Sequence, residues 1–307
     1  MLLRIATRQS PLALWQAQHV KRALERHNAA LRIELVPLVT SGDRNQDKAI
    51  AAAGGKGLFV KELDEALLEK RAELAVHSMK DVPAQRPEGL HLAAFLPGED
   101  PRDAFVSVNY ARLRELPHGA RVGTGSLRRQ AQLRALRPDL LVSELRGNVG
   151  TRLARLDEGR FDAILLACAG LIRLGESARI RESLDVDDFV PAIGQGVIGI
   201  ECREDDHEAR QIVGGLSHTD TATRLAAERA LNGRLGGSCT VPVAGHAVVT
   251  GAQLVLTGLV AAPDGAKIVK DRVEGPAARA AQLGDELAER LLAQGAREIL
   301  RAIGVAV

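Results

Sequence analysis

The feature that most constrains the fold is the alternation of short strand-like runs with helical stretches along the first two thirds of the chain. A strand expected at residues 2–6 is followed by a helix from about residue 11 to 28 and a second strand at 32–38. Ser10 and Pro11 mark the start of that helix, because serine caps helix N-termini and proline is favoured at the first helical position. The alternation predicts mostly parallel sheets with helices on their faces, in which ligands bind beyond the carboxyl ends of the strands.

The pattern indicates two α/β units. In the first unit we expect a further helix at 58–71 and strands at 74–77 and 90–96. In the second unit the expected elements, in chain order, are a strand at 121–123, a helix at 126–136, a strand at 140–145, a helix at 148–158, a strand at 163–167 and a helix at 169–182. The runs 97–101 and 191–196 are expected to be the crossings between the units, because they are rich in proline and glycine.

The last part of the chain changes character. A helix at 221–231 precedes three alternating runs and a closing helix at about 276–300, which together indicate an α+β domain with an antiparallel sheet. The alternating runs are 243–249, 253–260 and 267–273. We therefore expect three domains, formed by residues 1–96 together with 197–214, by 102–190, and by 219–307.

Composition narrows the class of protein. The 307 residues carry a net charge of +2 and only 2% aromatic residues, so neither a basic field nor aromatic stacking platforms for nucleic acid are expected. Cys168, Cys202 and Cys239 lie far apart without metal-ligand spacing, so we expect neither a disulfide framework nor a metal site. No signal peptide or membrane-length apolar run is apparent. We expect a cytoplasmic monomer that contacts neither nucleic acid nor membrane.

Cationic and small polar residues recur where strands lead into helices, at residues 7–10, 54–57, 123–129 and 146–152. Free backbone N–H groups and the helix dipole favour anions there, and arginine adds bidentate recognition of carboxylate or phosphate. A capped helix with a solvated arginine explains any one of these places, but four together predict a cleft for a ligand with several negative charges. The chain has neither a P-loop nor a dinucleotide-binding glycine pattern, which disfavours a nucleotide. Arginines at helix starts are not expected in the core, so the fold should survive their replacement.

Two single residues leave alternatives open. Cys239 lies in the glycine-rich run 232–243, where it is either an accessible functional thiol or a buried structural cysteine. Asp81 is the only carboxylate in the loop 76–83, directly after an expected strand. It is either a turn residue or, in a cation-lined cleft, the group that stabilises positive charge on a substrate.

Seven runs of sequence together closely resemble the porphobilinogen deaminase family. They are Arg4–Trp15, Gly54–Leu63, Ala75–Pro83, Glu99–Phe105, Ser126–Gln130, Leu145–Leu153 and Gly194–Gly196. The resemblance implies two domains similar to the halves of a periplasmic binding protein and a third that carries a cysteine linked by a thioether to a dipyrromethane cofactor. It implies an enzyme that condenses four porphobilinogen molecules head to tail, releases ammonia each time and frees the linear tetrapyrrole hydroxymethylbilane. The alternative is a two-lobed anion- or solute-binding protein without catalysis, which would not require the cysteine or the third domain.

The resemblance also implies roles for individual residues. Cys239 is the expected attachment point of the dipyrromethane, and Asp81 is the expected catalytic carboxylate. The other residues expected to bind the cofactor are Ser78, Lys80, Thr124, Ser126, Arg128, Arg129 and Arg146. Those expected to bind porphobilinogen are Arg8, Ser10, Arg146, Arg152, Arg173 and Gln195, while Lys56 and Phe59 are expected at a lid or cleft. The acetate and propionate on each pyrrole ring account for the many cationic groups.

Three positions depart from the family pattern. Ser238 precedes the cysteine where the family often has glycine, and we expect this to be tolerated because the hydroxymethyl group is small. The family often has serine at the position of Gly125 and lysine near Ala52, so one or two substrate contacts are expected to be missing.

Overall fold

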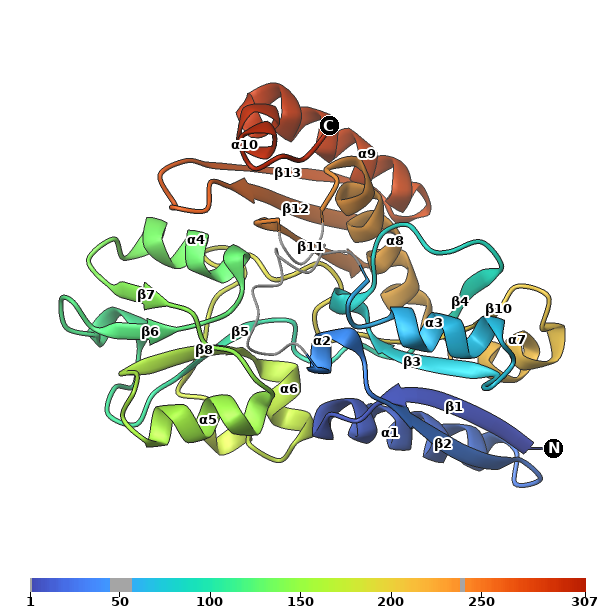
Figure 1. Cartoon of the computed structure of the whole chain (residues 1–307). Coiled ribbons are helices and arrows are strands. Elements are labelled where there is room, and N and C mark those ends of the chain that lie inside the picture. The colour runs from blue at the N-terminus through green and yellow to red at the C-terminus, as the bar shows by residue number, and fades with distance from the viewer. Residues whose placement is uncertain (1, 45–56, 238–240) are drawn as a thin grey trace. The chain divides into compact units, whose positions relative to one another are not determined.

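The computed structural model describes residues 2–44, 57–237 and 241–307 (Figure 1). The chain divides into two compact units. Unit 1 consists of Met1–Glu99 and Gly196–Ala222, and unit 2 consists of Asp100–Gln195 and Thr223–Val307.

Unit 1 is built on a mixed sheet. In spatial order its described strands are β2 (Arg32–Leu38), β1 (Leu2–Arg8), β3 (Leu74–Ser78), β10 (Ile198–Arg203) and β4 (Leu90–Phe95). β1 pairs in parallel with β2 and β3, whereas β10 pairs antiparallel with β3 and β4. The carboxyl ends of β1 and β3, at Arg8 and Ser78, therefore lie at the same edge of the sheet.

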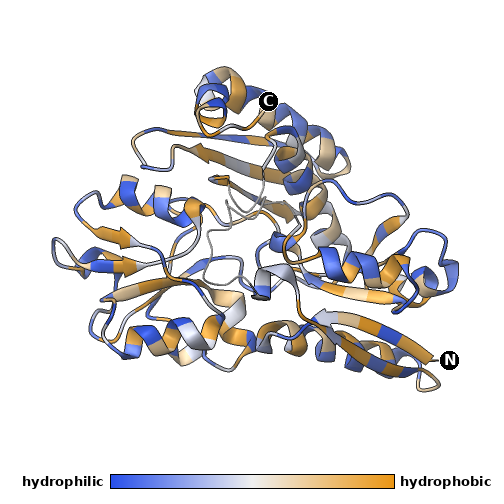
Figure 2. Cartoon of the chain, in the orientation of Figure 1, coloured by the Kyte–Doolittle hydropathy of each residue, from blue (hydrophilic) through white to orange (hydrophobic). Residues whose placement is uncertain are grey.

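Helices bury their apolar stripes against this sheet. The helical elements of unit 1 are α1 (Pro11–His27), α2 (Ser41–Arg44), α3 (Lys61–Leu68), the 3-10 turn η2 (Met79–Asp81) and α7 (His207–Gly214), and α8 (Thr219–Arg234) runs on into unit 2. α1 starts as predicted, because the Ser10 hydroxyl accepts a hydrogen bond from the amide of Ala13 at 3.4 Å. Its buried Val20 and Leu24 pack in one core with Ile5 of β1. Figure 2 shows the strands largely hydrophobic and the helices mixed.

Unit 2 contains a second sheet with the same pairing pattern. In spatial order its described strands are β7 (Leu141–Ser143), β6 (Arg121–Gly123), β8 (Ala163–Ala167), β5 (Asp103–Val106) and β9 (Glu182–Ser183). β6 pairs in parallel with β7 and β8, and β5 pairs antiparallel with β8 and β9. The helical elements are η3 (Leu113–Glu115), α4 (Leu127–Leu136), α5 (Val149–Asp157), α6 (Cys168–Arg173) and η4 (Ser177–Arg179). In each sheet the reversed strand, β10 or β5, directly follows one of the expected crossings.

The rest of unit 2 is a small α+β layer. Its antiparallel sheet consists of β11 (Val243–Thr250), β12 (Gln253–Ala261) and β13 (Ile268–Pro276), in that order. The closing helical elements are η5 (Ala277–Arg279), α9 (Ala280–Leu291), η6 (Leu292–Ala296) and α10 (Arg297–Ala302). Leu256, Leu287 and Leu231 of α8 are fully buried in their shared core. On the opposite face, Leu259 packs in a separate cluster with Ala131 of α4.

The predicted fold class, two α/β lobes followed by an antiparallel α+β domain, is confirmed. Two helix predictions are wrong in extent. The helix expected at 169–182 ends at Arg173, because Gly175 adopts a left-handed φ of 76° and the chain then enters β9. The helix expected at 276–300 is interrupted at Gly295, where φ is 108°. Within the described residues, no helix is both long enough and apolar enough to cross a membrane.

Candidate active site

The carboxyl ends of β1 and β3 bring Arg8 close to Asp81. The Arg8 Nη1 atom lies 3.6 Å from the Asp81 Oδ2 atom. Both side chains open into one pocket of unit 1, whose lining includes Ser10, Gln16, Phe59, Ser78 and Lys80. Of the residues predicted for the first lobe, those that the structure describes thus line a single pocket.

A carboxylate that the sequence did not point to holds Arg8 in place. Asp43 of α2 accepts from Arg8 Nη2 at 2.5 Å and from Arg8 Nε at 3.2 Å. Burial alone would raise the pKa of Asp43, but hydrogen bonds from Arg8 and from the Thr40 hydroxyl, 2.7 Å away, lower it below its usual value. The ring of Phe59 lies 4.3 Å from the guanidinium carbon of Arg8 and adds a cation–π contact. Arg8 is therefore fixed with one edge toward Asp81.

Two further contacts shape this pocket. Gln16 Nε2 donates to the Ser78 hydroxyl at 2.8 Å, which links α1 to the end of β3. A Cβ atom on Gly42 would lie 2.3 Å from the Phe59 ring, so only glycine lets the ring rest on α2. The Ser10 hydroxyl, predicted to bind substrate, caps α1 at the pocket wall.

In unit 2, a buried carboxylate gathers two of the predicted cofactor ligands. Asp103 of β5 accepts from Arg128 Nη1 at 2.7 Å and from Arg129 Nε at 2.8 Å. Gln195 Nε2 donates to Asp103 at 3.0 Å and to the carbonyl oxygen of Pro101 at 2.7 Å. Gln195, predicted to bind substrate, therefore lies beside Arg128 and Arg129.

The expectation that helix-start arginines lie outside the core is wrong for Arg128 and Arg129. They are only 4% and 5% exposed, because α4 begins against β5 and directs both guanidinium groups inward. Burial would raise the pKa of Asp103, but the two guanidinium groups hold it far below its usual value. Two cations then face one carboxylate, and Arg128 Nε lacks a hydrogen-bond acceptor among the described residues. A buried excess of positive charge fits a ligand that brings its own carboxylates, as a dipyrromethane does.

The loop before α4 depends on a glycine. Ser126 caps α4 by accepting from the Arg129 amide at 3.4 Å, and its own amide donates to the Thr124 hydroxyl at 3.3 Å. A Cβ atom on Gly125 would lie 2.9 Å from the carbonyl oxygen of Leu145, so a serine at this position would require the backbone to shift. Thr124 and Ser126 therefore lie at the carboxyl end of β6, as predicted.

The remaining arginines lie elsewhere in unit 2. Arg146 follows β7, the parallel neighbour of β6, and pairs with Glu144. Arg152 on α5 donates from Nε to the carbonyl oxygen of Gly147 at 2.7 Å. Arg173 is the last residue of α6 rather than at a helix start. Lys56, Cys239 and the departures Ala52 and Ser238 lie outside the described residues.

Taken together, fold and site define a protein with two α/β lobes whose strand ends hold cations and carboxylates for an acidic small molecule. Comparison with known proteins is more specific. Residues 3–211 match the family description "Porphobilinogen deaminase, dipyromethane cofactor binding domain". Residues 222–293 match "Porphobilinogen deaminase, C-terminal domain".

Among solved structures the chain is distantly similar to periplasmic binding proteins. The VFT2 domain of BvgS from Bordetella pertussis is 16% identical with a TM-score of 0.44, over 72% of this chain and 91% of that one. A putative methionine-binding lipoprotein from Bacillus subtilis is 12% identical with a TM-score of 0.44, over 71% and 90%. A periplasmic binding protein of high arginine specificity from Salmonella typhimurium is 15% identical with a TM-score of 0.41, over 72% and 93%.

The chain belongs to the porphobilinogen deaminase family, because the two family matches together cover most of its length. It is a transferase, a hydroxymethylbilane synthase that condenses four porphobilinogen molecules head to tail with release of ammonia, and it uses a dipyrromethane cofactor as the primer. The family match outweighs the alternative of a binding protein without catalysis.

Proposed function

We propose that Asp81 is the catalytic carboxylate of this reaction and that Arg8 binds a carboxylate of porphobilinogen beside it. The observation that carries this proposal is the 3.6 Å contact between Arg8 and Asp81 within one pocket. The Asp81 side chain is 29% exposed, so a ligand can reach it. A carboxylate there accepts hydrogen bonds from pyrrole N–H groups and stabilises the positive charge that forms when porphobilinogen loses ammonia.

The dipyrromethane, when bound, supplies the nucleophilic carbon to which the first substrate is joined. Cys239 is the proposed attachment point. Cys168 and Cys202, the other two cysteines of the chain, are buried, and burial raises the pKa of each thiol to about 11. Both are therefore poor candidates for a thioether.

The proposed carboxylate ligands divide into two groups. Arg128 and Arg129 would hold cofactor carboxylates, supported by the buried excess of positive charge around Asp103. The other proposed cofactor ligands are Ser78, Lys80, Thr124, Ser126 and Arg146. Substrate would contact Ser10, Arg152 and Arg173 in addition to Arg8, and Lys56 and Phe59 would act as a lid or cleft wall. Gln195 is also proposed to contact substrate, and its side-chain oxygen accepts from Arg129 Nη2 at 3.5 Å.

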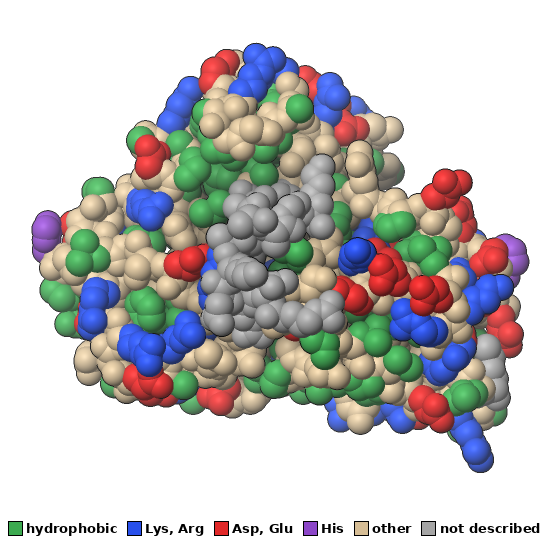
Figure 3. All heavy atoms as spheres, viewed as in Figure 1, with side chains coloured by type: hydrophobic (Ala, Val, Ile, Leu, Met, Phe, Trp, Pro, Cys, Tyr) green, Lys and Arg blue, Asp and Glu red, His purple; other side chains and the backbone are tan. Residues whose placement is uncertain are grey.

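We further propose that the protein works as a cytoplasmic monomer that does not bind nucleic acid. A net charge of +2 supports the absence of nucleic-acid binding, as does the face shown in Figure 3, where basic and acidic side chains are interspersed. A division into three domains, at 1–96 with 197–214, 102–190 and 219–307, is also proposed, and the separate sheets support it.

Replacement of Asp81 by asparagine tests the assignment of the catalytic carboxylate. The amide keeps the shape of the side chain and removes its charge, so ammonia release by cofactor-loaded protein should fall at least about a hundredfold. Asp81→Glu should retain more activity, because it keeps a carboxylate at a displaced position. Asp139→Asn is the matched control, since Asp139 is also paired with an arginine, Arg137 at 2.6 Å, but does not line the pocket. Near-normal turnover of Asp81→Asn would make Asp81 a turn residue.

A further inference from the structure

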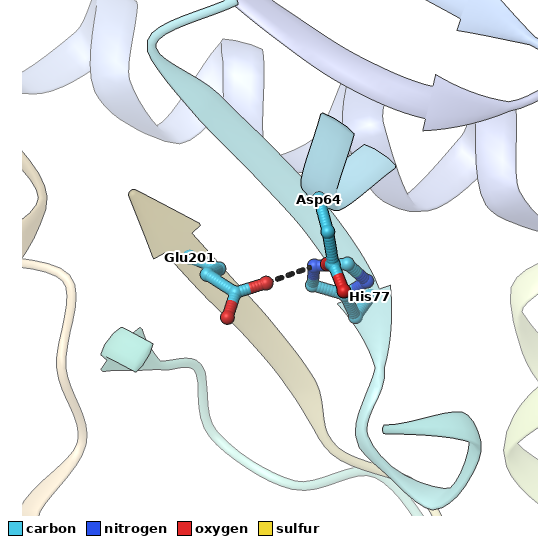
Figure 4. A group of neighbouring side chains, drawn as sticks. All are labelled: Asp64, His77 and Glu201. Atoms are coloured by element: carbon cyan, nitrogen blue, oxygen red, sulfur yellow. Dashed lines mark hydrogen bonds and ion pairs between the residues drawn. The ribbon is translucent and has the colours of Figure 1, made fainter. Parts of the chain in front are cut away.

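A buried charge cluster adjoins the pocket of unit 1. Asp64 of α3, His77 of β3 and Glu201 of β10 converge on one point (Figure 4). His77 Nε2 lies 3.0 Å from Glu201 Oε2. The Glu201 side chain is completely buried, and that of His77, whose residue also lines the pocket, is 2% exposed.

An arginine from the loop after Asp81 completes the cluster. Arg86 Nη2 lies 2.5 Å from Asp64 and 2.7 Å from Glu201, and Arg86 Nε donates to Glu201 at 2.8 Å. Ligand atoms of Asp64, His77 and Glu201 lie within 4.8 Å of one another, as in a metal site, but the guanidinium already supplies the cation. Burial would raise the pKa of Glu201, whereas the hydrogen bonds from His77 and Arg86 lower it to about 2.

Two residues of the cluster flank the segment that carries Asp81 in the sequence. His77 directly precedes Ser78, and Arg86 comes five positions after Asp81. Glu201 therefore binds both ends of the short segment that carries Ser78, Lys80 and Asp81. Between the two ends, the amide of Met79 donates to the carbonyl oxygen of Val197 at 3.0 Å, just before β10. The segment is thus fastened at three points, two at Glu201 and one at Val197.

We infer that Glu201 and Arg86 are positioning residues that fix the orientation of Asp81 toward its substrate. The inference rests on the proposed role of Asp81. It follows from geometry, because η2 is a single turn whose direction depends on where its two ends are held. A displacement of about 1 Å of a catalytic group can cost on the order of a hundredfold in rate.

Arg86→Met in the cofactor-loaded enzyme tests the inference, with Arg203→Met as the matched control. Arg203 is in the same unit, its side chain is 12% exposed against 10% for Arg86, and it is similarly tied, to Asp206 and to the carbonyl oxygens of Leu67 and Ala72. Both variants should lower the melting temperature. Only Arg86→Met should lower kcat, by roughly tenfold to a hundredfold, with KM for porphobilinogen within about twofold of wild type.

Hydrogen exchange supplies a readout that does not depend on activity. The amides of Met79 and Val82, bonded within and beside η2, should exchange faster in Arg86→Met and at the wild-type rate in Arg203→Met. An unchanged exchange rate together with a kcat equal to that of Arg203→Met would overturn the inference. If Asp81→Asn, assayed in parallel, keeps normal turnover, the proposed role of Asp81 fails, while hydrogen exchange still decides whether Arg86 holds the segment.

Arg86→Met leaves two buried carboxylates without their cation, and it could therefore fail to fold. A second variant covers this case. The double variant Arg86→Met with Asp64→Asn removes one of those charges and still detaches the segment. It should show the same loss of kcat and the same faster exchange, and wild-type values of both would contradict the inference.

Discussion

Arg128 donates hydrogen bonds to both carboxylate oxygens of Asp103, at 2.7 and 3.1 Å. Arg129 binds the same carboxylate from the next position of α4. Asp103 thus orients two arginines at the start of α4. Its single negative charge balances only one of their two positive charges. The same interaction makes these arginines, which we propose as cofactor ligands, part of the core as well.

Removal of the shared carboxylate should therefore be costly. Asp103→Ala leaves two buried guanidinium groups without their counter-charge, and we expect a loss of roughly 3 to 5 kcal/mol in the free energy of unfolding. Urea denaturation of protein prepared with and without cofactor measures this loss. Asp139→Asn, which removes a half-buried partner of a single arginine, Arg137, should cost clearly less stability than Asp103→Ala. Equal stability of the two variants would show that the ion pairs of Asp103 with Arg128 and Arg129 do not stabilise the fold.

The buried carboxylates also predict the direction of the acid response. The pKa of Glu201 is lowered from 4.5 to about 2 in the folded protein, so its contribution to stability is present above pH 4.5 and is lost as the pH falls toward 2. The lowered pKa of Asp103 acts in the same direction. Glu201→Gln should be less stable than wild type at pH 7 and should lose less stability on acidification. Parallel stability curves for the two proteins between pH 5 and 2 would contradict this assignment.

The predictable part of the fold is the part encoded by neighbouring residues. Ser10 and Pro11 define the start of α1 locally, and alternation defines β2 and the hairpins of the last sheet. The strands β5 and β10 were not predicted, because nearly every side chain in them is buried, so they lack the apolar–polar alternation that marks a half-buried strand.

The same limit applies to the site. The residue types and positions of Arg8, Arg128 and Arg129 were predictable from their helix starts. Their partners were not, because Asp43 and Asp103 lie 35 and 25 positions away along the chain. The only sequence signal for Asp103 is its place in the matching run Glu99–Phe105, and nothing in the sequence marks Asp43.

A comparison of two hairpin glycines tests whether the turn at Gly265 packs against α4. Gly265 and Gly251 both have left-handed φ angles, 76° and 59°, in turns of the same antiparallel sheet. A Cβ atom on Gly265 would lie 2.7 Å from the carbonyl oxygen of Ala131 in α4, whereas nothing lies within 4 Å of one on Gly251. Gly251→Ala should cost about 1 kcal/mol through backbone strain alone, and Gly265→Ala should cost clearly more. Equal melting temperatures would show that this turn does not rest on α4.

Arg8 can be tested as a substrate ligand separately from Asp81. Arg8→Gln removes the cation next to Asp81 and leaves Asp43 without its partner. The Arg8 side chain is 21% exposed, so its loss should weaken substrate binding less than the loss of a fully buried charge would. We expect KM to rise roughly tenfold or more. Steady-state kinetics with porphobilinogen measure it. An unchanged KM would leave Arg8 as a structural partner of Asp43.

The central claim, that this chain carries a covalent dipyrromethane on Cys239, is tested most directly by the mass of the intact, freshly isolated protein. We predict a mass above that of the sequence by two linked pyrrole rings. Cys239→Ala should lose both the added mass and the activity, whereas Cys168→Ala and Cys202→Ala, which alter buried thiols, should keep the added mass. An active protein with the unmodified sequence mass, or an unchanged added mass in Cys239→Ala, would contradict the account.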